Sequence, residues 1–309
     1  MRLLLGLLIV GLAVLPAWAA PTLDGTRDAS YGAPWAVQTV QTGFGDANPN
    51  GGSELDAAYA QVEGGALYLM LTGNLENNFN KLNIFIDSVA GGQNMLENDA
   101  NFGGTNPEND GWAGKHAGMM FDTGFAADYM LILRNGDSGG DRFDIDYAVV
   151  GGGLGAFQTA GDVFGGSLTG SNASALPNGI GLAFDRSNTA GVTGGNDAAD
   201  QTAAAAVTTG VELAIPLSVL GNPNPVDIKV AAMINGSNHD FLSNQLLGGL
   251  PAPQGNLGGD GSGTFTGTLS GINLKNFAGD QFFHVFVPEP STAMLATLAL
   301  IGLLGRRRS

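Results

Sequence analysis

The sequence contains no cysteine and only three histidines, and it is poor in charged residues. Of its 309 residues 13% are charged, where roughly 25% is usual in soluble domains. The absence of cysteine excludes disulfide bonds and cysteine nucleophiles, so stability must come from the hydrophobic core, sheet hydrogen bonding or bound ions. The histidines, His116, His239 and His284, are scattered along the chain and form no catalytic motif.

Basic residues are the scarcer of the two charged classes, with 12 Lys and Arg against 28 Asp and Glu. Four basic residues, Arg2 and the run 306–308, and one acidic residue, Glu289, lie in the terminal segments. The segment from Ala20 to Val287 therefore holds 8 basic and 27 acidic residues, a net charge of −19. Without a basic patch to release counterions from phosphate, this charge excludes a nucleic-acid partner and disfavours binding to an anionic membrane surface.

Glycine and apolar residues are abundant instead. The chain has 50 glycines, and 44% of its residues are hydrophobic. This apolar content is too high for a disordered protein and is sufficient to build a core. We expect residues 20–287 to form one acidic, Gly- and Asn-rich domain with long loops.

Residues 1–19 have the layout of a secretory signal peptide. Arg2 supplies a positive start, Leu3 to Leu15 form an apolar run, and Ala17-Trp18-Ala19 gives a small-x-small cleavage pattern. We predict an N-terminal signal helix, cleavage after Ala19, and export. The apolar run is shorter than the roughly 20 residues that span a bilayer, which disfavours a membrane anchor.

Residues 288–309 form a three-part tail. Pro288, Glu289 and Pro290 are followed by an apolar stretch from 293 to 305 and then by Arg306, Arg307 and Arg308. The prolines keep the chain extended and allow a helix only after position 290. The apolar stretch predicts a hydrophobic helix of roughly 20 Å. The arginines predict a cytoplasmic stop, which places the acidic domain across the inner membrane.

This tail closely resembles the PEP-CTERM sorting signal of surface proteins handled by the exosortase system. The resemblance covers Val287 to Ser309 and includes the triplet, the apolar stretch and the arginines in the expected order. It implies transient anchoring in the inner membrane, recognition and removal of the tail by an exosortase-type enzyme, and a final place at the cell surface or outside the cell. A permanent single-pass anchor in the same orientation is the alternative.

Between these two signals the sequence predicts β structure. In Leu82 to Asp87 and in Phe143 to Val149, apolar residues alternate with polar ones, which is typical of half-buried strands in antiparallel sheets. Clusters of Gly, Asn, Asp and Pro between the apolar runs indicate turns. We predict strands within 35–40, 66–71, 82–86, 129–133, 145–150 and 228–234, one helical turn at 216–220, and long loops or plain strands in 151–210.

The fold class that follows is all-β, an antiparallel β-sandwich or jelly roll of about a dozen short strands. Three further segments resemble the DOMON-type sandwiches and the related family-nine carbohydrate-binding modules: Leu23 to Gly32, Leu67 to Asn74 and Gly210 to Gly221. The strand 228–234 and Leu242 to Gln245 continue the resemblance. It implies a jelly-roll-like sandwich, while insertions around 93–112 and 151–210 depart from the pattern.

Catalytic residues are hard to single out. Asn238-His239-Asp240 places an acid beside a histidine, but sequence neighbours on a strand point to opposite faces, so a structural or solvated role for His239 is expected. The many carboxylates leave a two-carboxylate glycoside hydrolase open without indicating a pair.

A calcium-binding loop is a second hypothesis. Asp46, Asn48, Asn50 and the glycine after it match the first half of a calcium loop, in which oxygen ligands alternate. The second half does not match, although Glu54 and Asp56 lie close by. Solvated turns are the alternative, so the predicted cofactor is none, with Ca²⁺ as the candidate.

Function divides into three classes. The first is a non-enzymatic surface or extracellular-matrix protein that acts by adhesion or assembly. The second is an extracellular carbohydrate-binding module, for which Trp112 in a polar loop is the candidate ligand contact, while Trp35 begins an apolar run and is expected in the core. A glycoside hydrolase is the third. The expected partners are an exosortase-type enzyme and a polysaccharide or matrix.

Overall fold

The computed structural model describes residues 19–48, 51–100, 112–159, 169–172, 176–224 and 226–287. The expected signal helix and C-terminal helix lie outside these residues. Within the described ranges, no helix has the length and apolar character that crossing a membrane requires.

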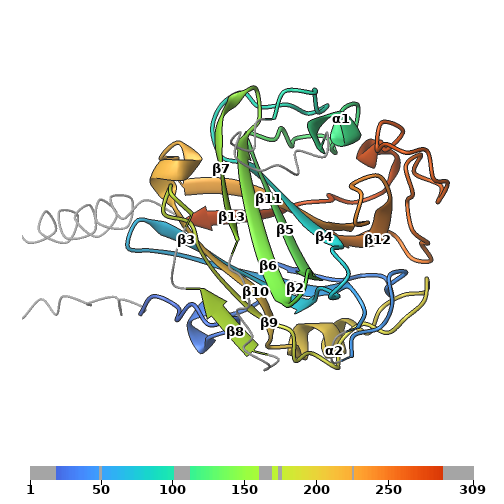
Figure 1. Cartoon of the computed structure of the whole chain (residues 1–309), viewed down its shortest axis with the longest axis horizontal. Helices are drawn as coiled ribbons and strands as arrows, with labels where there is room; N and C mark the ends of the chain where they lie inside the picture. Colours follow the sequence, from blue (N-terminus) through green and yellow to red (C-terminus); the bar gives the residue numbers. More distant parts are fainter. Residues whose placement is uncertain are drawn as a thin grey trace, which may run out of the picture.

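Two antiparallel sheets make up the fold, which confirms the all-β prediction (Figure 1). The first sheet has the strand order β1 (Ala36–Val37), β2 (Glu54–Glu63), β3 (Ala66–Asn74), β10 (Gly210–Pro216), β9 (Gly181–Asp185) and β8 (Thr169–Asn172). The second sheet has the order β12 (Leu242–Leu247), β11 (Val226–Asn235), β4 (Lys81–Asp87), β5 (Tyr129–Asp137), β6 (Asp141–Val149) and β7 (Gly153–Thr159), and β13 (Phe283–Val287) also pairs with β11.

Helices are short and lie in the connections. Among the described residues two are α-helical, α1 (Trp112–His116) and α2 (Gln201–Ala206), and three are 3-10 turns, η1 (Ala29–Tyr31), η2 (Leu217–Leu220) and η3 (Leu274–Asn276). The predicted turn at 216–220 is η2. The region 151–210, expected as loops or plain strands, holds β7, β8, β9 and α2.

The main core lies between the two sheets. Leu82, Ile84 and Ile86 of β4 point into it, and β6 contributes alternate residues in the same way, as the period of two predicts. From the first sheet, β3 supplies Leu67, Leu69 and Leu71. The inward faces of these strands are therefore read correctly from the sequence.

The prediction that these strands are half-buried is wrong, because the outer face of the second sheet is covered as well. Phe85, Ile132 and Met233 on that face pack against residues of the long connections, such as Phe121 and Leu257, in a second core. The described parts of the long connections, 88–100, 112–128 and 248–282, thus form a third layer over the sheet. Polar residues that alternate with the inner core, including Asn83, Asp144 and Asp146, are consequently buried too.

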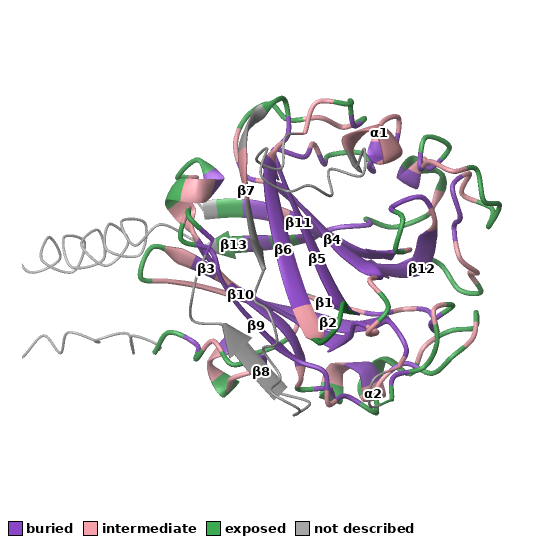
Figure 2. Cartoon of the chain, in the orientation of Figure 1, coloured by how far each residue is buried: buried purple, intermediate pink, exposed green. Residues whose placement is uncertain are grey.

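The first sheet is covered less completely. Its outer face carries a small cluster around Tyr31, Tyr59 and Met70 beneath the N-terminal segment. The ends of β2 and β3 that meet at their hairpin are only half buried (Figure 2). This incompletely covered part of the sheet lies on the side of the molecule where the described chain begins and ends (Figure 1).

The predicted strand 35–40 is mostly wrong, since only Ala36 and Val37 pair with β2. Beyond them the chain turns to the loop 193–199, with bridges from Val40 to Ala198 and from Thr42 to Gly194. The register of β2 is interrupted between Leu55 and Ala57, so a longer strand cannot stay in step with it.

Candidate functional site

The fold separates the residues of the predicted calcium loop. Glu54 and Asp56 are fully buried on β2, whereas Asp46 and Asn48 are exposed, and Asn50 lies outside the described residues. Asn48 and Gly51 exchange backbone hydrogen bonds of 3.1 and 2.9 Å, which closes the loop as a tight turn. No group of three or more Asp, Glu or His side chains in the described ranges is arranged to hold a metal ion. Calcium binding stays a prediction.

Glu54 and Asp56 form a buried carboxylate pair. Asn188 Nδ2 donates to Glu54 Oε1 at 2.9 Å and to Asp56 Oδ2 at 3.2 Å. The other two oxygens accept from backbone amides, Glu54 Oε2 from Ala47 at 2.9 Å and Asp56 Oδ1 from Val192 at 2.8 Å. The pair therefore fixes two loops to β2. Nothing in the amino-acid sequence indicates the contacts of this pair with Asn188 and Val192.

This pair holds a proton at neutral pH. The pKa of Glu54 is raised to about 9, by burial first and by the neighbouring Asp56 carboxylate second, and burial raises the pKa of Asp56 to about 7. Buried beneath the loop 188–192, the pair has no access for a substrate. It does not suit the two-carboxylate chemistry of a glycoside hydrolase, which needs a sugar and a water between the acids.

Glu212 on β10 anchors the N-terminal segment. Its carboxylate accepts hydrogen bonds from Tyr31 Oη at 2.7 Å and from the amides of Asp24 and Gly25, both at 2.9 Å. Burial raises the pKa of Glu212, and these three donors oppose that rise. Two of the three segments that carry the sandwich resemblance thus meet in one structural contact, which leaves no open ligand site at Glu212.

Two of the three histidines come together, which their distance in the sequence does not indicate. His116 at the end of α1 and His239 are buried above β4, and their ring centroids lie 5.7 Å apart. His116 Nε2 lies 3.4 Å from Asn83 Oδ1. Burial keeps the pKa of His239 well below its usual range, so this histidine is neutral. The predicted structural role of His239 fits this position.

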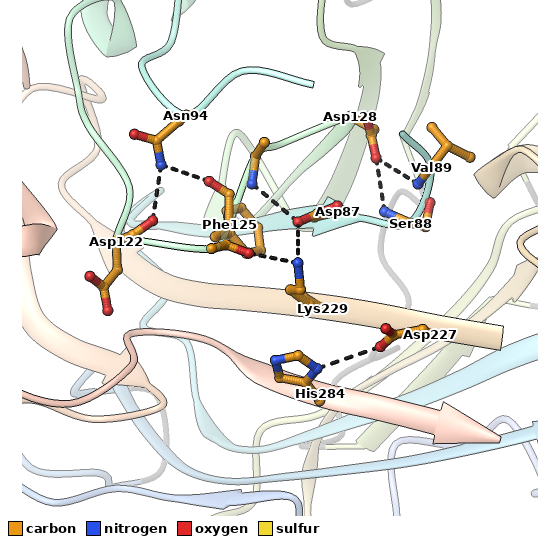
Figure 3. Close-up of polar contacts among 12 residues, drawn as sticks. Asp87, Ser88, Val89, Asn94, Asp122, Phe125, Asp128, Asp227, Lys229 and His284 are labelled. Atoms are coloured by element: carbon orange, nitrogen blue, oxygen red, sulfur yellow. Dashed lines mark hydrogen bonds and ion pairs between the residues drawn. The ribbon is translucent and has the colours of Figure 1, made fainter. Parts of the chain in front are cut away.

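An open groove lies where β4 ends and β11 begins, and Figure 3 shows the polar contacts around it. Its volume is about 470 Å³, and its walls include Asp87, Asn222, Asp227 and Lys229. An adjoining groove of about 560 Å³, with Tyr129 and Tyr147 in its wall, meets it at Gly221. Sequence reasoning did not find this region.

The charged groups of the first groove are engaged with one another. Lys229 Nζ lies 3.0 Å from Asp87 Oδ2 and donates to the carbonyl of Gly124 at 2.6 Å. His284 Nδ1 lies 3.5 Å from Asp227 Oδ1, with both side chains about half exposed (Figure 3). Ser88 Oγ, the nearby hydroxyl, donates to the carbonyl of Leu220. The arrangement offers polar contacts to a ligand but no activated nucleophile beside the histidine.

Trp35 is not in the core as expected. Its side chain is 42% exposed at the edge of the first sheet, with Nε1 donating to the carbonyl of Ala60 at 3.0 Å. The cause is the shortness of β1, which leaves Trp35 outside the paired residues. Trp112 begins α1, and its side chain lies outside what the structure describes, so its role as a ligand contact stays a prediction.

Comparison with known proteins identifies the end of the chain. Residues 286–308 match the PEP-CTERM protein-sorting motif. The chain carries a PEP-CTERM sorting signal. Neither the curated proteins nor the solved structures contain a match to the chain. The likeness of the core to DOMON-type sandwiches therefore stays a prediction.

The PEP-CTERM motif marks an exported, surface-sorted protein that an exosortase processes. Its triplet Pro288 to Pro290 and its arginines 306–308 lie outside the described residues. The matched segment begins inside β13, where Phe286 and Val287 pair with Asp227 and Val226. The last two residues of β13 therefore belong to the matched segment.

Proposed function

We propose that this protein is a non-enzymatic surface protein that acts by adhesion or assembly after sorting through its PEP-CTERM tail. The observation that carries the proposal is that its buried acidic residues hold loops in place. Glu54, Asp56 and Glu212 hold loops to the sheets through protein donors, and each of their carboxylates is enclosed. Such groups stabilise a scaffold and are not placed to meet a substrate.

The shape of the molecule supports the same role. Long connections cover the second sheet. The open groove beside β11 offers polar groups, and its His284–Asp227 pair has no activated nucleophile next to it. Loops on a rigid sheet scaffold are where binding contacts concentrate in such folds. Polysaccharide or matrix is the partner class that we propose for this protein.

The test compares three strains: one that produces the full chain, one that lacks residues 288–290, and one that lacks the protein. We expect surface display and attachment to a polysaccharide-coated surface only in the first strain. Unchanged display without the triplet would refute its sorting role. Equal attachment by the strain that lacks the protein would refute adhesion.

A further inference from the structure

Part of the outer face of the first sheet is not covered by other segments. The N-terminal segment and α2 bury most of this face, and Tyr59 Oη donates to the carbonyl of Ala205 in α2 at 2.8 Å. Toward the β2–β3 hairpin the cover ends, and the outward side chains Gln61, Glu63 and Tyr68 are only partly buried. Together with Trp35 we call these residues the Trp35 window.

The register places these side chains on one face. Ala36 pairs with Ala58, so Trp35, one residue earlier, lies beside Tyr59, whose side chain points outward. Gln61 is two residues further along β2 on the same face and pairs directly with Tyr68 on β3. An indole just before β1, an amide on β2 and a phenol on β3 therefore share one face of the sheet.

Trp35 is held in a fixed position although it is exposed. Its backbone N–H donates to the carbonyl of Ala58 at 2.8 Å, and its indole N–H donates to the carbonyl of Ala60 at 3.0 Å. Singly exposed apolar residues are common on protein surfaces, but an exposed Trp anchored at both backbone and ring, beside a partly exposed Tyr, forms a preorganised aromatic surface.

Gln61 adds an amide N–H donor beside this surface. Its Oε1 is enclosed by the protein and accepts no hydrogen bond from the described residues. Its Nε2 donates to the carbonyl of Ala19 at 3.5 Å, and Ala19 is the last residue before the predicted signal cleavage. Removal of the predicted signal peptide would free this N–H donor, which can then donate to a ligand hydroxyl.

The charges around the Trp35 window favour a neutral ligand over a polyanion. Glu63 lies within it, and the segment 20–287 carries a net charge of −19. The nearby Arg27 is stacked over the Tyr59 ring, with 4.5 Å from the guanidinium carbon to the ring centroid. A polyanion would be repelled, whereas the C–H faces of neutral sugar rings suit an aromatic face and their hydroxyls suit an amide.

We propose that the Trp35 window is a binding site for neutral polysaccharide, with Trp35 as its stacking platform and Gln61 as its hydrogen-bonding group. This inference rests on the proposed adhesive function and names the ligand class and the residues through which adhesion works.

The experiment titrates the purified, signal-cleaved protein with soluble starch and soluble β-glucan as neutral probes and with alginate as a polyanionic probe. Binding is followed by tryptophan fluorescence and by calorimetry. We expect at least one neutral probe to bind and alginate not to bind. Trp35→Ala should weaken binding at least about tenfold, and Trp35→Phe should retain it within about threefold because a ring remains.

Two matched controls separate this site from other aromatic residues. Trp112→Ala removes the candidate that the sequence suggests, and Phe265→Ala removes a side chain that is 64% exposed in a distant loop. Both should bind as the unchanged protein does, and thermal melting checks that each variant is folded. Equal binding by Trp35→Ala, loss of binding only in Trp112→Ala, or no binding to either neutral probe would overturn the proposal.

The outcome is distinguishable from failure of the adhesive function itself. If producing cells attach to the coated surface and Trp35→Ala cells attach equally well, adhesion stands and the window is refuted. If producing cells attach no better than cells without the protein, the adhesive function fails first.

Discussion

The buried pair Glu54 and Asp56 makes the stability of this protein fall as the pH rises above neutral. In the unfolded chain both carboxyl groups lose their protons near pH 4. In the folded chain the pKa of Asp56 is about 7 and that of Glu54 about 9, because both are buried and lie together. Between pH 4 and 9 the native state therefore binds more protons than the unfolded state, and its stability decreases with pH.

The range from pH 7 to pH 9 separates this effect from that of groups which titrate in acid. The neutral His239, whose pKa is lowered by burial, costs stability only below about pH 6.5, where the unfolded histidine takes up a proton. Asp141, whose pKa is lowered mainly by its hydrogen bonds with Arg186, titrates in acid. One proton retained by Glu54 corresponds to about 1.4 kcal/mol per pH unit, or roughly 2 to 3 kcal/mol across this range.

Urea denaturation at pH 7, 8 and 9 measures this loss, and the melting temperature should fall by about 5 °C over the same range. Glu54→Gln should reduce the dependence of stability on pH, whatever its effect on stability at pH 7, since the titrating group is gone. Glu97→Gln, which changes an exposed carboxylate, should leave the slope as it is. An equal slope in Glu54→Gln and the unchanged protein would refute the account.

Two further predictions concern Glu212 and the removal of calcium. Glu212→Gln should change stability by less than about 1 kcal/mol, because the amide oxygen can accept from both backbone N–H groups while the amide nitrogen donates to Tyr31 Oη. Glu212→Ala should cost about 3 kcal/mol of stability, since three buried donors lose their acceptor. Urea denaturation at pH 7 distinguishes the two variants, and equal losses would contradict the hydrogen-bond account. Adding EGTA at pH 7 should shift the melting temperature by less than about 1 °C, because the four oxygens of Glu54 and Asp56 already accept from protein donors. A fall of several degrees would instead show that a bound divalent cation stabilises the protein.

The sequence predicts the inner layer of this fold well, for a local reason. Alternation over a few residues decides which side chains of β4 and β6 point between the sheets, and Leu82 or Ile145 can be placed from that pattern alone. The covered outer face could not be predicted in this way. Phe85 and Asn83 alternate with the core residues as surface residues would, and only the distant connections that pack on them bury them.

The hydrogen bonds that hold the loops in place produce no periodic pattern in the sequence. Asn244 Oδ1 accepts from the amide of Gly43, 201 residues earlier in the chain, and Asp56 accepts from Val192, 136 residues later. A single side chain that meets a single backbone amide over such separations has no pattern to detect. The prediction that Trp35 lies in the core is wrong for a related reason, because the burial of its side chain depends on how far β1 continues along β2.

An exported chain without cysteine has no disulfides with which to secure loops of this length. Here carboxylates and amides in the sheets do it, by accepting the backbone N–H groups that the loops leave unpaired, as Glu212 does for Asp24 and Gly25. Each such acceptor is enclosed in the process, so its pKa rises. The acidic residues thus have two separate roles. Exposed ones give the domain its negative charge, whereas buried ones anchor loops at sites where burial makes ionisation unfavourable, so this anchoring depends on pH as a disulfide would not.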